Sequence, residues 1–540
     1  MPTSAVHENP RKKRLAIKVG IAVVLVCLLV GTLSVLLMPT FRADATYTIR
    51  EAYDLPDDSV EVVVLGASTL HRAFSPDYAY EHYGINSFNS GSNAQPPIAS
   101  YYLLKDLENS QRGSLKVVLL DASTLVNTGD FFTSSVGAER VAGCMSPSLN
   151  KLEYLWAVSQ EYDDVQFFEL LIPVLRYHDR WEELEDDDFA YNSLVAQSGH
   201  FHGQPLFPST LWSNVTQGNA GSYGREKNLT ITQEIEDDPA DLRADWVDLS
   251  ARYIDRIALF CSENDLELVL VKTPEANWGD RQHDSVAQFA KERGLEFLDM
   301  TLPEIWDSCD LSYDTDFNDD KHPNLSGSMK LTKYLGESLL HCYSLSDDRL
   351  EESGGFTSED LEMFSQTVED SNLSSCTSLT EYLDLINRDR YTVFISVRGE
   401  AAEGIGEEQR AMFESMGLEK LSNLIPNQSY IGILSGGEVL LEKVGEDGSK
   451  IEQQGSFDGE KVLTRKTNMQ PNAQLEDSLT LASTGKDSGA NATIKIRGGQ
   501  KAENKRGINF VIYNHETGCM IDTSSFDTHL GLKRTSDLVQ

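Results

Sequence analysis

Short apolar runs that alternate with helical segments constrain the fold of this chain more than any other feature. Residues 61–65 (EVVVL) have the length and β-branched content of a strand that is buried on both faces. A short extended stretch at 85–88, a helix at 98–109 and a strand at 115–120 follow it in turn. This alternation predicts an α/β fold with a parallel sheet, in which ligands bind at the carboxyl ends of the strands.

Two short motifs place reactive side chains near such strand ends. Ser68 follows the first strand through the small turn Gly66-Ala67, and Asp319 and His322 stand three residues apart much later in the chain. A serine hydroxyl is a poor nucleophile unless an imidazole accepts its proton and a carboxylate fixes the tautomer of that imidazole. The three residues therefore supply the groups that nucleophilic acyl chemistry requires.

A glycine loop lies between these two motifs. Gly91 and Asn93 fall in the stretch 89–95 (NSGSNAQ), directly after the extended segment at 85–88. A glycine there can direct its backbone N–H at the negative charge that develops on a carbonyl oxygen during acyl transfer.

At these positions the chain resembles a known family, the SGNH or GDSL-like esterases and acyltransferases. The resemblance rests on the blocks at 66–68 (GAS), 89–91 (NSG) and 319–327 (DDKHPNLSG), and it covers roughly residues 58–345. The last block looks like that of the bacterial cell-envelope members, which include relatives of the D-alanine transfer protein of teichoic acids and of the alginate O-acetyltransferases.

That resemblance implies an SGNH-type parallel sheet with flanking helices over residues 50–345. It also implies a covalent acyl-enzyme reaction that needs neither a metal nor an organic cofactor. The implied roles are nucleophile for Ser68, general base for His322, orienting carboxylate for Asp319, and oxyanion donors for the N–H groups of Gly91 and Ser68.

The chain departs from the family pattern after its third strand. Hydrolytic members usually carry a Gly-x-Asn-Asp block there, whereas this strand ends in 121–124 (DAST). Either Asn93 replaces the asparagine donor or the third oxyanion contact is missing. A lost donor costs about 2–4 kcal/mol of transition-state stabilisation, so slow turnover, a specialised substrate or loss of activity would follow.

Two further stretches hold candidate substrate contacts. Arg180 and Trp181 lie in an aromatic, charged segment that resembles part of the bacterial envelope group. That segment is either a substrate-facing wall or a buried tryptophan with paired charges. The next apolar strand delivers Lys272, with Trp278 and His283 shortly after it, to the edge of the sheet where ligands bind.

The acidic loop before His322 has an alternative interpretation. Its spacing DxDxNxD at 314–320 opens like a calcium-binding EF-hand loop. However, Asp319 stands where that loop needs glycine and Leu325 where it needs glutamate, so we favour a site without metal.

The N-terminus carries an uncharged run of twenty apolar or small residues at 19–38, which is long enough to span a bilayer. Basic residues at 11–14 and 18 precede it, which predicts a cytoplasmic tail at 1–18, a single-pass anchor at 19–38 and extracellular main domains. A cleaved signal peptide is the alternative, but the run exceeds the usual apolar core of a secretory signal.

Charge and length set further bounds. The formal net charge is −39 and no basic stripe occurs beyond the first residues, which argues against binding of nucleic acid or of anionic lipid by the folded part. A chain of 540 residues is too long for one core and predicts two folded domains. An acidic, serine-rich stretch at 346–387 has the composition of a linker with one short helix.

Short β-rich runs at 388–530, interrupted by one helix at 407–416, predict a mainly antiparallel β domain. The motifs at 391–401, 428–433 and 506–514 resemble the interleukin-like EMT inducer, or PANDER-like, domain. This resemblance implies recognition rather than reaction, as a carbohydrate-binding module or as a structural spacer.

Together these features predict a membrane-anchored esterase or O-acyltransferase that acts on acyl groups of cell-envelope glycans through Ser68, His322 and Asp319. One alternative is a surface protein that binds glycan and keeps a vestigial triad. Another is an assembly role, in which the domain presents substrate to a membrane-bound acyltransferase.

Overall fold

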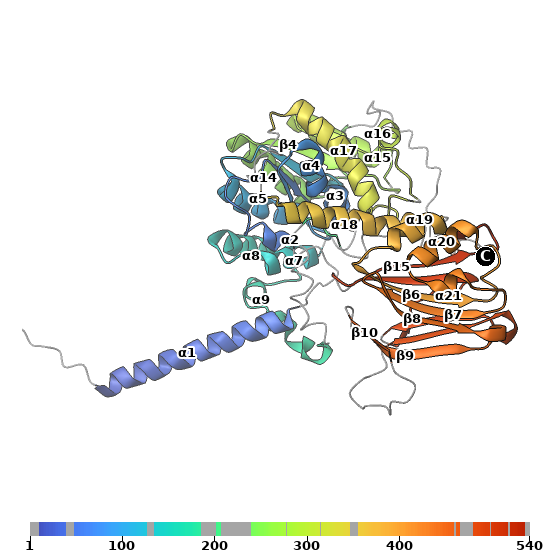
Figure 1. The fold of residues 1–540 in the computed structure, drawn as a ribbon. Coiled ribbons are helices and arrows are strands. Elements are labelled where there is room, and N and C mark those ends of the chain that lie inside the picture. Colours follow the sequence, from blue (N-terminus) through green and yellow to red (C-terminus); the bar gives the residue numbers. More distant parts are fainter. Residues whose placement is uncertain are drawn as a thin grey trace, which may run out of the picture.

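The computed structural model describes residues 10–38, 48–126, 134–184, 201–206, 239–276, 278–313, 315–345, 355–457, 461–464, 479–496, 498–516 and 519–534. A long N-terminal helix, an α/β unit and a mainly β unit follow one another along the chain (Figure 1). This order confirms the predicted fold class at that level: a parallel α/β sheet, a mostly antiparallel C-terminal sheet and one apolar N-terminal helix.

The α/β unit is built on a five-stranded parallel sheet with the strand order β2-β1-β3-β4-β5. Its strands are β1 (Val62–Leu65), β2 (Ser87–Asn89), β3 (Val117–Asp121), β4 (Glu267–Lys272) and β5 (Glu296–Asp299). Its helices are α2 (Thr48–Glu51), α3 (Ser68–Ala73), α4 (Pro76–Tyr83), α5 (Pro97–Gln111), η2 (Ser123–Leu125), α7 (Val136–Cys144), α8 (Leu149–Glu161), α9 (Phe167–Leu171), α10 (Val174–Tyr177), η3 (His178–Glu183), α13 (Pro239–Arg243), α14 (Asp248–Glu263), α15 (Asp280–Arg293), α16 (Pro303–Ser308) and α17 (Leu325–Cys342).

Helices cover both faces of this sheet, which explains why its strands read as unbroken apolar runs. Because neighbouring side chains in a strand point to opposite faces, Val63 and Leu65 pack with residues of α5, α14 and α15. Val62 and Val64 pack on the other face with residues of α3, α4 and α17.

The turn after β1 is held by a buried carboxylate. Asp121, at the end of β3, accepts hydrogen bonds from the Ala67 N–H (3.1 Å) and from both the N–H and the hydroxyl of Ser123 (each 2.9 Å). Gly66 has a φ of +138°, and a Cβ added there would lie 2.2 Å from the Asp121 Cβ. Only glycine fits this approach, so the two strand ends are locked together just before Ser68.

The C-terminal unit is a twisted sheet that folds over on itself. Its strands are β6 (Tyr391–Arg398), β7 (Ser429–Ser435), β8 (Glu438–Gly445), β9 (Ile451–Phe457), β10 (Val462–Thr464), β11 (Leu479–Thr484), β12 (Asn491–Ile496), β13 (Gly499–Gln500), β14 (Gly507–Asn514), β15 (Cys519–Asp527) and β16 (Lys533–Arg534). Its short helices are α20 (Glu407–Ser415), α21 (Glu419–Ser422), η6 (Glu446–Gly448) and η7 (Lys486–Ser488). Side chains on one face of β6 and β14 pack under helices, and those on the other face pack against β9, β11 and β12, which gives the unit two cores.

The segment between the units corrects the expectation of an acidic linker with one short helix at 346–387. Two helices form there, α18 (Ser358–Ser375) and α19 (Leu379–Ile386). Their apolar residues, including Leu373 and Tyr382, are buried in the C-terminal core, and Thr357 caps α18 reciprocally with Asp360. Burial of a few apolar residues therefore decides that this segment is helical, despite its acidic composition.

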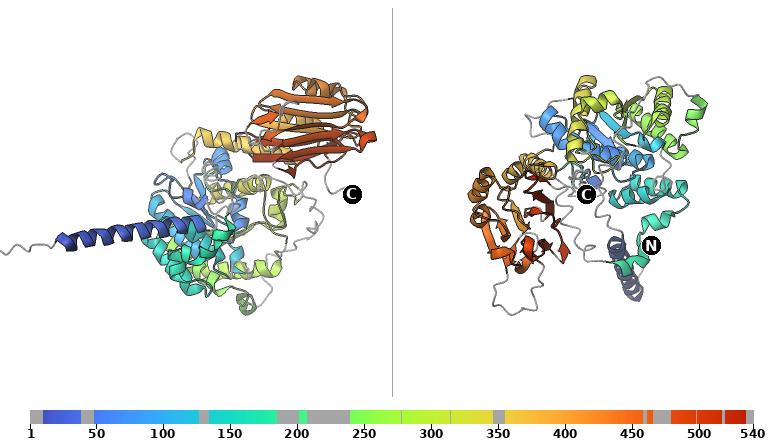
Figure 2. Two further views of the ribbon diagram at one scale, coloured as in Figure 1. Left: turned by 90° about the horizontal axis from the view of Figure 1, so that it is seen from below. Right: turned by 90° about the vertical axis from the view of Figure 1, so that its right-hand side faces the viewer.

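The start of α18 also joins the two units. Phe356 stacks on His202 and Tyr80 of the α/β unit, with ring centroids 3.6 and 4.3 Å apart. α18 itself packs against α4 and α17 and then runs into the β unit (Figure 2).

The N-terminal helix α1 (Pro10–Leu37) is long and apolar enough to cross a membrane between Ile17 and Leu37. Nearly all of that span is exposed in the folded chain. A membrane anchor and an uncleaved signal sequence share these properties.

We predict that Gly66→Ala destabilises the α/β unit by more than about 3 kcal/mol, because the new methyl group meets Asp121 in a backbone conformation that favours glycine. Gly294→Ala is the matched control. Gly294 also has a positive φ (+65°) but no neighbour within 4 Å of the added Cβ, so we expect about 1 kcal/mol. Urea unfolding measures both, and equal losses would contradict the proposed packing.

A second prediction concerns the last described strand. Arg534 forms a buried ion pair with Asp522 (2.7 Å), which also accepts the Tyr382 hydroxyl (2.6 Å). Arg534→Met should cost about 3–5 kcal/mol, since it leaves a buried carboxylate without its cation. Arg506→Met, at a half-exposed pair with Asp527, should cost no more than about 1 kcal/mol. Similar losses in the two variants would argue against the buried pair.

Candidate active site

The candidate site lies where the strand order of the parallel sheet reverses. From β1 the chain moves to β2 on one side and then returns to β3 on the other. In open α/β sheets such a reversal leaves a crevice at the carboxyl ends of the two central strands. Ser68 begins α3 directly after β1, and Asp121 ends β3.

Three side chains form a continuous hydrogen-bonded chain beside this end of the sheet. The Ser68 hydroxyl lies 2.8 Å from Nε2 of His322, and Nδ1 of His322 lies 2.7 Å from Oδ2 of Asp319. The loop before α17 supplies Asp319 and His322. Within this loop, Asp319 Oδ1 also accepts the N–H groups of Lys321 (3.0 Å) and His322 (2.8 Å). These bonds fold the carboxylate back onto the imidazole ring.

The charge on Asp319 fixes the roles of the two ring nitrogens. Burial acts to raise its pKa, but the hydrogen bonds from His322 and the backbone outweigh burial and lower the pKa to about 2. An ionised carboxylate only accepts hydrogen bonds, so Nδ1 of a neutral His322 carries the proton. Nε2 is then free to accept the proton of Ser68.

The glycine loop packs directly beneath the serine turn. The Ser90 and Ser92 N–H groups donate to the carbonyls of Val64 (2.8 Å) and Gly66 (3.1 Å). A Cβ on Gly91 would lie 2.7 Å from the His71 Cβ, so the position needs glycine for close packing. The Gly91 N–H donates to Asn89 Oδ1 at 3.3 Å, a long bond to a side chain.

Asn93 lies in the same loop and is half-buried. Its carbonyl accepts from Arg140 (3.2 Å), while its side-chain oxygen is buried without a hydrogen-bond partner in the part of the chain that the structure describes. That oxygen only accepts hydrogen bonds, whereas an oxyanion would need the Nδ2 donor, so the role of Asn93 as an oxyanion donor stays a prediction.

Lys272 lies in the interior of the α/β unit rather than on its surface. Its side chain is fully buried, and Nζ donates to the Thr273 carbonyl and to Glu275, both at 2.8 Å. Burial raises the pKa of Asp121, and the Lys272 ammonium opposes that rise. Lys272 therefore supports the carboxylate under the serine turn, which differs from the substrate contact expected from sequence.

Trp278 and His283 are also buried. Both bind the same carboxylate oxygen of Asp299, through the indole N–H of Trp278 (2.9 Å) and Nδ1 of His283 (2.7 Å). This network fastens the loop after β4 to the end of β5. As with Lys272, burial argues against the expected substrate contact.

Arg180 and Trp181 lie on η3, which packs against α1. Arg180 donates to the carbonyls of Leu37 (3.4 Å) and Met38 (3.3 Å) at the end of α1. The Trp181 side chain is 63% exposed, so the alternative of a buried tryptophan is wrong. These residues belong to the junction with the N-terminal helix.

One part of the site wall was not predicted from the sequence. Residues 201–206 pack beside the serine turn, where the Gly203 carbonyl binds Nε2 of His71 (2.9 Å) and the His202 carbonyl accepts the Asn89 N–H (2.9 Å). Burial lowers the pKa of His71 to about 3, so this histidine is neutral and structural. The segment lacks apolar periodicity, and only its glycine and its single histidine suggested a tertiary contact.

The alternative of a calcium loop is not supported by the donors around Asp316. Its two carboxylate oxygens accept from the Ser326 hydroxyl (2.7 Å), the Ser312 N–H (2.8 Å) and the Lys330 ammonium (2.9 Å). These groups use the carboxylate to hold the loop against α17. Asp314, the first residue of that spacing, lies outside the described residues.

Comparison with known proteins identifies part of the C-terminal unit. Residues 353–437 match the model of the family described as interleukin-like EMT inducer. No curated protein matches the chain. The match confirms the resemblance for this part, and it begins before residue 388, so that it includes α18 and α19. These comparisons give no support for an SGNH-type domain.

The pKa of Asp319 predicts a pH dependence. Because the pKa falls from 3.8 to about 2 on folding, the carboxylate stabilises the folded state above about pH 4, and this contribution is lost as the pH falls toward 2. The difference in unfolding free energy between the natural chain and Asp319→Asn should shrink over that range. A difference that does not change with pH would contradict the ionised Asp319–His322 pair.

Proposed function

We propose that the α/β unit is an SGNH-type serine esterase or O-acyltransferase that acts on acyl groups of cell-envelope glycans. The observation that carries this proposal is the unbroken chain from the Ser68 hydroxyl through His322 to Asp319, with distances of 2.8 and 2.7 Å. These three groups stand in the order that activates a serine nucleophile.

The chemistry would proceed in two steps. In the first, His322 Nε2 takes the Ser68 proton while Ser68 Oγ bonds to the acyl carbonyl carbon, and the ester bond to the glycan breaks as His322 protonates the departing sugar oxygen. In the second, water or another sugar hydroxyl gives its proton to His322 and attacks the acyl-Ser68 carbonyl. The free acid or the new ester then leaves as His322 returns the proton to Ser68 Oγ.

The developing oxyanion needs donors. The proposal assigns this role to the Ser68 N–H at the start of α3 and to the Asn93 amide, with the Gly91 N–H joining if it turns away from Asn89. In the structure the Gly91 N–H is instead bonded to Asn89 Oδ1. This bond is the specific observation that favours the competing hypothesis, a glycan-binding surface protein with a vestigial triad.

The proposed setting is the outer face of the cell membrane. α1 would span the bilayer once, with the basic residues at 11–14 in the cytoplasm and both units outside. The C-terminal unit would bind the glycan while the α/β unit works on its acyl groups. A membrane-bound acyltransferase is the partner that a transfer reaction would call for.

A fluorophosphonate probe tests the proposal directly. We predict covalent labelling of the detergent-solubilised full chain at Ser68, with none in Ser68→Ala. Asp319→Asn should lower the labelling rate by about 10⁴-fold, since it removes the acceptor that fixes the His322 tautomer. Ser415→Ala, an exposed serine in the C-terminal unit, is the control and should label normally.

The same preparations should release acid from isolated, acylated cell-wall polymers, and Ser68→Ala should not. Absence of both labelling and acid release, with glycan binding retained, would contradict the enzyme and support the competing hypothesis.

A further inference from the structure

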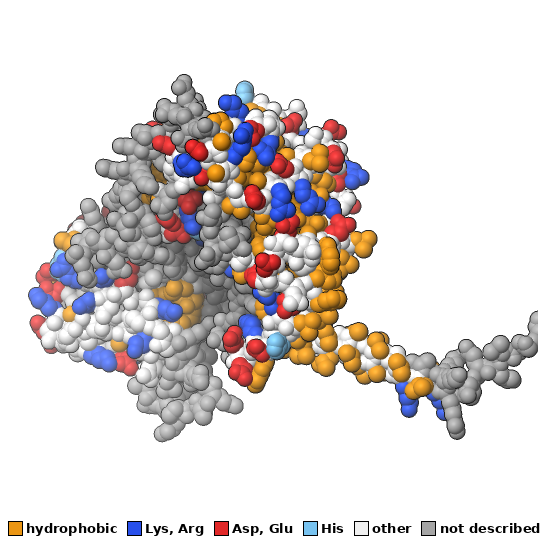
Figure 3. Space-filling model, turned by 180° about the vertical axis from the view of Figure 1, so that it is seen from behind, with side chains coloured by type: hydrophobic (Ala, Val, Ile, Leu, Met, Phe, Trp, Pro, Cys, Tyr) orange, Lys and Arg blue, Asp and Glu red, His pale blue; other side chains and the backbone are white. Residues whose placement is uncertain are grey.

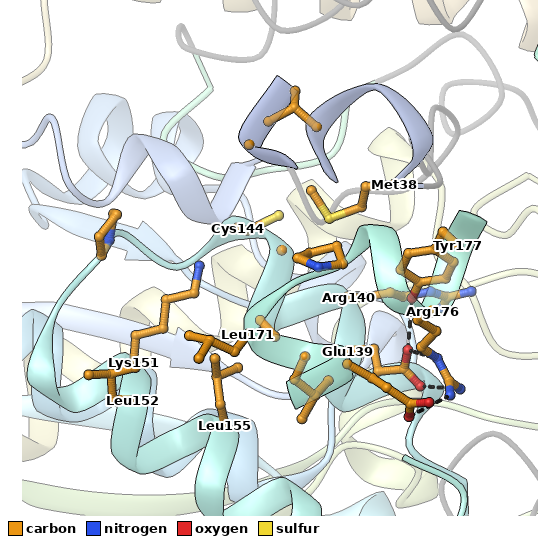
Figure 4. Close-up of a pocket in the computed structure, with 18 of the residues that line it drawn as sticks. Met38, Glu139, Arg140, Cys144, Lys151, Leu152, Leu155, Leu171, Arg176 and Tyr177 are labelled. Atoms are coloured by element: carbon orange, nitrogen blue, oxygen red, sulfur yellow. Dashed lines mark hydrogen bonds and ion pairs between the residues drawn. The ribbon is translucent and has the colours of Figure 1, made fainter. Parts of the chain in front are cut away.

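A large apolar pocket lies where α1 meets the α/β unit (Figure 4). Its volume is about 1010 Å³, at the upper end of the range for pockets that hold small ligands. The end of α1 forms one wall through Val35, Leu36 and Met38, and α7 to α10 form the others, with Leu155 and Leu171 among the lining residues. It is thus built partly from the helix proposed to span the membrane.

The surface around this pocket is unusually apolar. Outside α1, twelve large hydrophobic side chains are exposed among the described residues, and seven of them fall between residues 149 and 181. These seven, which we call the apolar face, are Leu149, Leu152, Trp156, Phe168, Leu171, Leu175 and Trp181. In Figure 3 hydrophobic side chains run from the body of the molecule directly onto the N-terminal helix.

Such a face is costly in water and favourable in lipid. Contiguous exposed apolar surface marks an interaction site, and tryptophan is enriched where protein crosses from lipid to water. The face adjoins the Leu37 end of α1, because the Ser34 hydroxyl accepts the Val174 N–H (3.3 Å) and η3 packs against the same helix. If α1 spans the bilayer, the apolar face lies at the level of the lipid headgroups.

The pocket also carries net positive charge in a chain whose net charge is −39. Its charged lining residues are the cations Arg50, Arg140, Lys151 and Arg176 and the carboxylates Glu139 and Glu169. Both carboxylates already face Arg176, at 2.6 and 3.8 Å. Lys151 points into the pocket, donates to the Met145 carbonyl (2.8 Å) and has no carboxylate within ion-pair distance among the described residues.

We propose that this pocket binds an anionic phospholipid of the membrane, with an acyl chain along Leu155 and Leu171 and the phosphate at Lys151. The proposal rests on the membrane role of α1 but not on the chemistry at Ser68. An ammonium group next to an apolar cavity, at the depth of the headgroups, is complementary to a lipid phosphate above an acyl chain. A bound lipid would also fasten the α/β unit to the bilayer in a fixed orientation.

Photo-crosslinking tests the proposal with the full chain in lipid vesicles. Phosphatidylglycerol and diacylglycerol probes would each carry a diazirine in the acyl chain, and mass spectrometry would locate the labelled peptides. We expect the anionic probe to label residues 139–155 and 169–177 about tenfold more than the phosphate-free one, the ratio that one charge-assisted contact gives. Both probes should label α1 equally.

Two variants sharpen the result. Lys151→Gln keeps a hydrogen-bond donor but removes the charge, so it should abolish the preference for the anionic probe. Lys105→Gln, at an exposed pair with Glu153, is the matched control and should keep the preference. Gly143→Leu adds a side chain inside the pocket, next to Met38, and should lower pocket labelling by both probes at least fivefold.

Each contrary outcome is distinct. Equal pocket labelling by the two probes, or a preference that survives Lys151→Gln, would overturn the phospholipid assignment. Labelling of α1 alone would show an anchor without a lipid site, and no labelling of α1 would overturn the anchor and this proposal together. Fluorophosphonate labelling of Ser68 is expected to be unchanged in all variants.

Discussion

The carboxylate of Asp121 holds together the part of the fold on which the candidate site depends. It is buried at the end of β3 and accepts the Ala67 N–H of the neighbouring turn, so the turn after β1 cannot move without leaving a buried acceptor unsatisfied. Gly66 allows that approach and Lys272 offsets the cost of the buried charge. Ser68 lies two residues after Gly66, so the fixed turn also fixes the position of the Ser68 hydroxyl.

Much of this arrangement was accessible from the sequence. The β-branched runs predicted the parallel strands because both faces of the sheet are buried, and the strand-end rule placed Ser68. Asp319 and His322 reach it from the loop before α17 and not from a strand end, so their pairing with Ser68 followed from the chemistry of the motifs. The rule failed for Lys272, since position at a strand end does not say whether a side chain points outward or back under the neighbouring turn. The Lys272 ammonium instead binds Glu275 and the Thr273 carbonyl in the interior, and no pattern within the strand reveals that direction.

The helices α18 and α19 show a second limit. Their acidic, serine-rich sequence carries few apolar residues, yet those few are buried in the C-terminal core, and Phe356 before them stacks on His202. Tertiary contacts thus form helices that composition alone assigns to a linker. The two units are therefore joined by a packed helix rather than by a loose tether. Under the proposed function, a glycan bound by the C-terminal unit would be held in a set direction relative to Ser68.

The account as a whole rests on Ser68 becoming acylated. The most direct measurement is mass spectrometry of the full chain after brief incubation with an activated acyl ester, with peptide mapping of the modified residue. The account predicts one acyl group per chain on the peptide that contains Ser68, lost on longer incubation and absent from His322→Gln. An unmodified Ser68 would contradict the account. So would acylation spread over surface lysines to the same extent in the natural chain and in His322→Gln.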